Sequence, residues 1–198
     1  DALFIYDVKK SKQIEKISFE SNSQYKLEGI TRPVWNPQNN KIAFIGNNGF
    51  SSDVYIYNID NKNLFNITND WYSDTQASWH PNGKDLLIVS DRLDNLNVGK
   101  KIDIHNFTKH NVENSDIYKI IHNGSNNYTI KRLTNTEFNE SYPIYSPDGS
   151  KIAYISDETG IFNIYLSNDD CQTKEAVTNV LTGITQINWN SNNQIIFT

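Results

Sequence analysis

The side chains with the clearest capacity for chemistry are histidines and aspartates gathered in one segment, residues 91–115. They are His105, His110, Asp91, Asp94 and Asp103. Imidazole and carboxylate groups are natural metal ligands, so this composition would suit a divalent cation. Their spacing matches no common motif, since the sequence contains neither H-E-x-x-H nor a calcium loop of the form D-x-[DN]-x-[DN]-G. We therefore interpret the segment as a solvated polar loop and predict neither a metal site nor a cofactor.

Motifs for nucleophilic or phosphate chemistry are also missing from the sequence. It has no G-x-S-x-G elbow and no G-x-x-x-x-G-K-[ST] loop. The single cysteine, Cys171, has no partner for an internal disulfide and no C-x-x-C neighbour. No cluster of titratable residues recurs along the chain, and we predict that this span is not an enzyme. No pattern identifies a small-molecule ligand.

The charge pattern argues against two further classes of function. The formal net charge is -5, and no run of Lys and Arg exceeds two residues. Nucleic-acid binding needs a basic stripe that can neutralise phosphates, so we predict no nucleic-acid partner. No apolar stretch approaches the roughly 18 residues that a membrane-spanning helix needs, so we predict no membrane span.

A short sequence motif that recurs four times indicates which elements position the loops. Each copy is anchored by a bulky aromatic residue, and the anchors Trp35, Trp79, Tyr145 and Trp189 are spaced 44, 66 and 44 residues apart. A tight turn and a short apolar run follow each anchor. A period in the forties with only short apolar runs is typical of propeller blades. We expect the four anchors to pack between blades.

Each repeat divides into four short runs with strand composition. In one unit these runs are 30–35, 41–45, 53–59 and 63–68, separated by turn residues. The third run of a unit starts with an acid or amide (Asp53, Asp116 and Asn163) and continues with residues that are apolar on both faces. That pattern suits strands packed between neighbouring sheets. The sequence therefore predicts an all-β fold, a β-propeller of four-stranded antiparallel blades.

The repeats divide the chain into about four blades' worth of structure. We predict a half blade at 1–27, blades at 30–69, 74–135 and 141–179, and a half blade at 185–198, with an insertion at 91–115 in the second full blade. The two halves would either pair into a composite blade that closes a ring or belong to a longer propeller. Open half blades leave unpaired strand edges, and we favour a segment of a larger propeller.

The best-preserved repeat resembles a known family. The run from Tyr142 to Asp157, followed by Gly160 and Asn163-Ile164-Tyr165, is similar to the WD40-like PD40 repeat of TolB-like β-propellers. The units starting at Arg32 and Gln76 also match, whereas the unit starting at Gln186 matches weakly and has Ser191 in place of proline. The resemblance implies a propeller of six to eight blades.

The resemblance also implies a function and a location. Propellers of this family occur in periplasmic and cell-surface proteins that bind other proteins, so we expect a non-catalytic protein-interaction or scaffold module, periplasmic or extracellular, with a protein partner. They also form the non-catalytic propeller of serine peptidases similar to prolyl oligopeptidase and tricorn, which leaves a gating propeller as an alternative. A structural surface or adhesion repeat is a third.

The loops on one face of the blades are the predicted binding surface. In a four-stranded meander the second and fourth connections of each unit emerge on the same face, which brings the insertion together with 70–74 and 136–140. Aromatic and charged residues on exposed loops suit protein recognition. The predicted binding residues are Trp71, Tyr72, Asp74, Arg92, Phe138 and Glu140. The alternative is that Trp71 and Phe138 fold inward as packing between blades.

Five Asn-x-Ser/Thr triplets permit glycosylation in a secreted chain. They begin at Asn66, Asn106, Asn123, Asn127 and Asn139. Because asparagine is abundant, with 29 residues among 198, about this many triplets arise by chance. The triplets are therefore permissive of glycosylation and do not by themselves indicate it.

Overall fold

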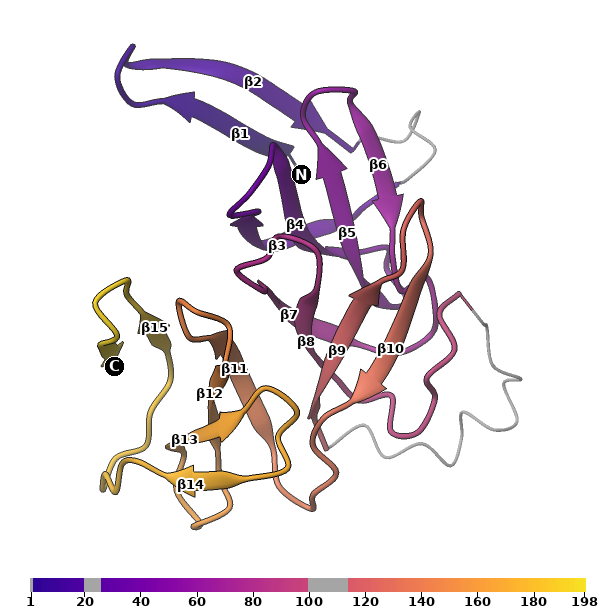
Figure 1. Cartoon of the computed structure of the whole chain (residues 1–198). Coiled ribbons are helices and arrows are strands. Elements are labelled where there is room, and N and C mark those ends of the chain that lie inside the picture. The colour runs from indigo at the N-terminus through magenta and orange to yellow at the C-terminus, as the bar shows by residue number, and fades with distance from the viewer. Residues whose placement is uncertain (1, 20–25, 100–113) are drawn as a thin grey trace.

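The computed structural model describes residues 2–19, 26–99 and 114–198. Within these ranges the regular structure consists of β-strands, and each sheet packs against the next along the chain (Figure 1). The predicted all-β propeller of four-stranded antiparallel blades is confirmed. Between Ser90 and Asp116 lies most of the predicted insertion, and its residues 100–113, with His105, His110 and Asn106, lie outside the described residues.

Three sheets have four strands each, in up-and-down order. The first contains β3 (Gly29–Trp35), β4 (Lys41–Asn47), β5 (Ser52–Asn58) and β6 (Asn63–Asn66). The second contains β7 (Asp74–Trp79), β8 (Leu86–Ser90), β9 (Asp116–His122) and β10 (Tyr128–Arg132). The third contains β11 (Glu140–Tyr145), β12 (Lys151–Ser156), β13 (Asn163–Asn168) and β14 (Lys174–Ala176).

Two antiparallel hairpins flank these sheets. They are β1 (Ala2–Asp7) with β2 (Lys12–Ser18), and β15 (Ile187–Trp189) with β16 (Ile195–Phe197). Within the described residues each hairpin is a separate two-stranded sheet, and the two lie apart in Figure 1. The composite blade considered from the sequence is therefore not formed in this structure.

The core is divided into layers between neighbouring sheets. Because successive strand residues point to opposite faces, Ala43 and Ile45 pack toward the β7–β10 sheet, whereas Ile42 and Phe44 pack toward the β1–β2 hairpin. The ring of Phe44 stacks on Tyr55, with centroids 5.6 Å apart. Each buried apolar side chain of this size contributes about 1.5–3 kcal/mol to stability. This two-sided burial explains why the middle strands are apolar at consecutive positions.

A hydrogen-bonded clasp explains why the third strand of each sheet begins with an acid or amide. Thr68 Oγ1 accepts a hydrogen bond from the N–H of Val54 at 3.0 Å and donates one to Asp53 Oδ1 at 3.3 Å. Asp53 Oδ1 also accepts the N–H of Asp70. Equivalent bonds join Thr134 to Asp116 and Thr178 to Asn163. The clasp fixes the last strand of one sheet and the start of the chain that leads to the next.

The aromatic anchors pack between blades with one exception. Tyr145 is buried, and Trp79 and Trp189 are half-buried against the hydrophobic clusters of the preceding sheets. Trp35 is 57% exposed, so the prediction was wrong for this residue. An anchor packs against the inner strands of the sheet before it, as Trp79 does against Val34. The sheet before β3 consists of β1 and β2 alone, so no inner strand covers Trp35 among the described residues.

Candidate functional site

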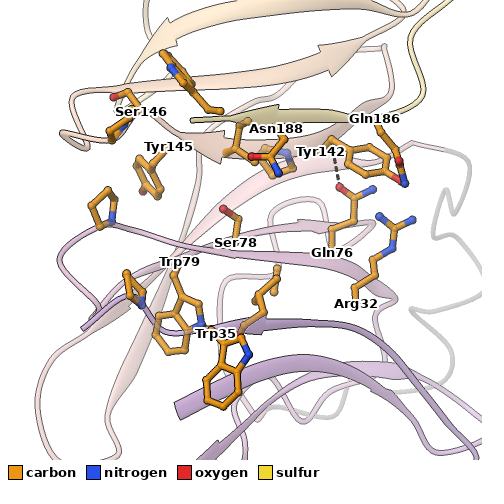
Figure 2. Close-up of a pocket in the computed structure, with 18 of the residues that line it drawn as sticks. Arg32, Trp35, Gln76, Ser78, Trp79, Tyr142, Tyr145, Ser146, Gln186 and Asn188 are labelled. Carbon is orange, nitrogen blue, oxygen red and sulfur yellow. Dashed lines mark hydrogen bonds between the residues drawn. The ribbon is translucent and has the colours of Figure 1, made fainter. Parts of the chain in front are cut away.

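A cavity lies where the first strands of four successive sheets meet. These strands are β3, β7, β11 and β15, and β7 contacts β3 and β11, which in turn contacts β15. Their side chains line a cavity of about 850 Å³ (Figure 2). Because each strand runs in the same direction through its sheet, residues at the same place in each repeat lie at similar depth in the cavity.

One end of the cavity is walled by aromatic and proline side chains. Figure 2 shows Trp35, Trp79 and Tyr145 at this end, where the strands run into their turns. Prolines of the same turns complete the wall: Pro37, Pro81 and Pro147. Trp79 is held by a hydrogen bond from its Nε1 to the carbonyl of Val34 at 3.3 Å. Flat, rigid side chains of this kind offer apolar contact area with little loss of conformational entropy.

The other end of the cavity is lined by a ring of four polar side chains: Arg32, Gln76, Tyr142 and Gln186. The guanidinium carbon of Arg32 lies 4.8 Å from the ring centroid of Tyr142. The N–H of Tyr142 donates to Gln76 Oε1, and Gln186 Nε2 donates to the Tyr142 hydroxyl at 3.4 Å. The hydrogen bond from Gln186, together with Arg32, holds the pKa of Tyr142 below its ordinary value despite partial burial.

Local backbone geometry directs two members of this polar ring into the cavity. Arg32 and Tyr142 have positive φ angles of 53° and 50°, and each precedes a proline. The strand pairing shifts register at both places, between Thr31 and Val34 and at the matching position of β11. Such bulges re-aim side chains, and residues held in the left-handed region cluster at binding sites. The repeated X-Pro dipeptide was the sequence signal for this pair.

His80 lies in the turn after β7 and joins two blades. Its Nδ1 accepts a hydrogen bond from the N–H of Asn82 at 2.9 Å, and its ring meets that of Tyr145 edge-on at 4.4 Å. A Cβ at Gly149 would lie 2.6 Å from the imidazole, so the turn of the next sheet closes on this ring. Burial, with a smaller effect from Lys119, lowers the pKa of His80. The residue has a packing role in this structure.

The predicted binding residues on the loop face are mostly buried. Arg92 and Asp74 are 0% exposed, and Arg92 forms ion pairs with Asp74 at 2.6 Å and with Asp70 at 2.9 Å. Its guanidinium also lies over the ring of Tyr72, which is 2% exposed. Burial raises the pKa of Asp70 to about 7, although the charge of Arg92 acts in the opposite direction. These buried residues connect neighbouring loops through ion pairs in the interior and do not form an exposed rim.

Glu140 is likewise buried, at 1% exposure, at the start of β11. Its carboxylate accepts a hydrogen bond from Thr136 Oγ1 at 2.7 Å and lies 3.1 Å from Thr134 Oγ1, whose one proton is shared between Glu140 and Asp116. Burial raises the pKa of Glu140 to about 7, the hydrogen bonds lower it in part, and the charge of Asp116 raises it further. Of the predicted set, only Trp71, which is 36% exposed, and the half-buried Phe138 reach the surface.

The opposite charges of the two loop segments were the signal for this burial. Asp70 lies in the connection before β7, Asp74 is the first residue of β7, and Arg92 lies in the connection after β8. Because both connections emerge on one face, an arginine in one and aspartates in the other are placed to pair. An exposed rim was inferred from the same residues because the sequence does not show which side chains face each other.

The triplets that permit glycosylation occupy different environments. Asn123 and Asn127 are exposed beside β10. Asn66 and Asn139 are half-buried, and their Nδ2 groups donate to Asp53 and Asp157 respectively. The remaining triplet, at Asn106, lies outside the described residues.

Metal-ligand clusters and membrane-spanning helices are two features that would define other classes of site. In the ranges that the structure describes, no group of three or more His, Cys, Asp or Glu residues is arranged to hold a metal ion. The described residues also include no helix that is long and apolar enough to cross a membrane.

Comparison with known proteins identifies the fold. No protein-family profile matches the sequence. Among solved structures, TolB from Acinetobacter baumannii is similar, with a TM-score of 0.66 and 17% identity over 99% of this chain and 42% of that one. A putative TolB from Agrobacterium tumefaciens has a TM-score of 0.68 and 20% identity, covering 94% of this chain and 58% of that one. These matches show a β-propeller fold with TolB-like neighbours.

A peptidase structure shares the fold as well. A chain from a study of two prolyl endopeptidases has a TM-score of 0.60 and 10% identity, and the match covers 94% of this chain and 27% of that one. The chain therefore spans between about a quarter and three fifths of the length of these neighbours.

Proposed function

We propose that this chain is a non-catalytic protein-interaction module that binds an extended segment of a partner polypeptide in the cavity between its inner strands. The observation that supports the proposal is the wall of Trp35, Trp79 and Tyr145 with the turn prolines, in a cavity of about 850 Å³. Aromatic-lined grooves bind extended, proline-rich segments because such segments lose little entropy on binding. A rigid scaffold of packed sheets keeps the cavity open.

The location that fits this role is the periplasm or the cell exterior. The TolB-like neighbours and the PD40-like repeats support a secreted or envelope protein. The net charge of -5, with no long basic run, fits a protein partner better than a nucleic acid.

Filling the cavity tests the proposal. Ser78 lies on β7 among the lining residues, so Ser78→Trp places a large side chain in the cavity (Figure 2). The matched control is Thr129→Trp on the exposed face of the outermost strand β10. Peptides selected from a library of short random sequences on the wild-type chain should bind the control and lose binding to Ser78→Trp. Equal binding to both folded variants would show that the cavity is not the site.

The loop face contributes a second contact in this proposal. Trp71 and Phe138 are the members of the predicted set that solvent reaches, while Tyr72, Asp74, Arg92 and Glu140 hold the loops beneath them. Trp71→Ala should weaken the binding of a natural partner that covers both the cavity and the loop face. It should leave the binding of the short selected peptides unaffected. Weakened binding of the short peptides would place Trp71 within the cavity site instead.

A gating propeller of a serine peptidase is the second candidate function, and the prolyl endopeptidase neighbour favours it. In that case the cavity would admit extended substrates to a hydrolase domain elsewhere in the polypeptide. The native polypeptide would then carry Ser, Asp and His in triad order outside these residues and would cleave a chromogenic prolyl peptide. A native protein that lacks both properties would exclude this candidate.

A further inference from the structure

The polar ring of the cavity is one layer of the repeat architecture. Arg32, Gln76, Tyr142 and Gln186 each lie three residues before the aromatic anchor of their strand. They come from four successive sheets, and Arg32 of β3 reaches Tyr142 of β11 past the intervening strand β7 (Figure 2). Because these side chains meet across the cavity, they form a floor beneath its aromatic end.

The floor has a positive charge that no acid neutralises within the described residues. The other two arginines are in ion pairs with aspartates, Arg92 with two and Arg132 with Asp94 and Asp116. Arg32 instead lies on the face of Tyr142. A guanidinium is planar and presents parallel N–H donors, which match a carboxylate in a bidentate pair. An exposed arginine held over an aromatic ring is pre-organised for such a ligand.

Two carboxylates lie near the floor without pairing with Arg32. Glu28 and Asp74 line a neighbouring cavity of about 510 Å³ to which Arg32 also contributes. Asp74 is engaged by Arg92, and the carboxylate of Glu28 lies alongside Gly49. Glu28, which lines the same neighbouring cavity, can compete with an anion at Arg32, and removal of its charge should strengthen anion binding.

The amides of the floor add neutral donors around the guanidinium. Gln76 uses its Oε1 to accept the N–H of Tyr142, which leaves its NH2 group to donate. Figure 2 shows the Gln76 amide, the Tyr142 hydroxyl and the Arg32 guanidinium close together at this end. Arg32 and Tyr142 both have positive φ angles beside a register shift in their strands, and residues held in this region cluster at binding sites.

We propose that this floor binds the C-terminal carboxylate of the polypeptide held in the cavity, with Arg32 as the anion-binding residue and Gln76 and Gln186 as neighbouring donors. The inference rests on the proposed function, because it names the part of the partner that the cavity accepts. Contacts of Arg32, Gln76 and Gln186 with Tyr142 run across the cavity from β3 to β15. A chain that enters between the tryptophans meets this layer, and we assign the group presented to Arg32 to its C-terminal end. An acidic side chain within a longer segment would require the chain to continue past these contacts.

Two measurements on the 198-residue chain test the inference. The first uses a synthetic peptide array in which every sequence is present with a free C-terminal carboxylate and again as the amide. Free acids should bind about tenfold or more tightly than amides, on the scale of one charge-assisted hydrogen bond. In Arg32→Met, free acids and amides should bind equally, whereas Glu28→Gln should preserve or increase the preference for free acids. Amidated peptides that contain internal acidic residues test whether a side-chain carboxylate can bind in place of the C-terminal one.

The second measurement needs no peptide and no variant. N-acetylglycine should shift the Nε–H resonance of Arg32 in an NMR titration, and N-acetylglycinamide should not, with the ion-paired Arg92 and Arg132 as internal references. Equal effects of acid and amide in both measurements would overturn the carboxylate site and leave the cavity as a peptide site. Selection of internal acidic residues in amidated peptides would overturn the chain-end assignment. A shift at Arg32 with peptide binding unaffected by Ser78→Trp would instead reject the proposed function and keep the anion site.

Discussion

Replacement of the buried Glu140 by glutamine should make the protein more stable at alkaline pH. Burial raises the pKa of Glu140 from 4.5 to about 7, so the native state holds this proton more tightly than the unfolded chain does. Stability is therefore lost as the pH rises through the window from about 4.5 to about 7. Each pKa unit corresponds to about 1.4 kcal/mol, and the full loss is about 3 kcal/mol above pH 7. Glu140→Gln keeps the shape, can still hydrogen-bond Thr134 or Thr136, and carries no charge.

The assay is urea unfolding of the wild type and Glu140→Gln between pH 5 and pH 8. The variant should be more stable by about 1 kcal/mol or less near pH 5 and by about 3 kcal/mol near pH 8. For a chain of this size that difference corresponds to roughly 6–12 °C in melting temperature. A wild type and variant with parallel pH profiles would refute the reasoning, because Glu140 would then ionise as freely in the native state as in the unfolded chain.

Two further substitutions test the contacts that join the blades. Arg92→Met should destabilise the protein by about 3–5 kcal/mol in urea unfolding at pH 8, because two aspartates then stay buried without their guanidinium; a loss below about 1 kcal/mol would show that the ion pairs are dispensable. Gly149→Ala should lower the melting temperature more than Gly160→Ala, because both glycines have positive φ but only the first would place a Cβ against His80. Equal losses for the two glycine variants would indicate backbone strain alone.

The sequence predicted the propeller because its signals are local and repeated. Anchors in a period of 44 residues, turn residues after each anchor and an acid or amide at the start of the third strand all follow from contacts that recur in each sheet, such as the clasp of Asp53 with Thr68. The same repetition led to the wrong prediction that Trp35 packs between blades. Its local sequence is that of the other anchors, but the surface against which an anchor packs belongs to the preceding sheet, which here has two strands.

The loop residues were harder to place because their environment depends on contacts between segments distant in sequence. Asp74 and Arg92 lie 18 residues apart and form a buried ion pair, yet each alone has the composition of an exposed loop. Glu140 begins β11, is buried, and is hydrogen-bonded to two threonines of the preceding loop. Sequence composition describes solvent preference on average, and a buried charge with a specific partner is the exception it cannot identify.

In a repeated fold, some positions of each repeat are constrained by contacts that recur in every sheet, whereas other positions can vary from sheet to sheet. One residue after the anchor, the side chain closes a turn in successive sheets, and the types found there, such as Asn36 and His80, bond or pack against the next turn. Three residues before the anchor, the four strands carry Arg, Gln, Tyr and Gln in the same geometric layer. The fold does not need different side chains at equivalent places, so their divergence supports the proposed binding of a single ligand by this layer. For this reason the polar ring around Arg32, more than the buried loop residues, is where specificity should be sought.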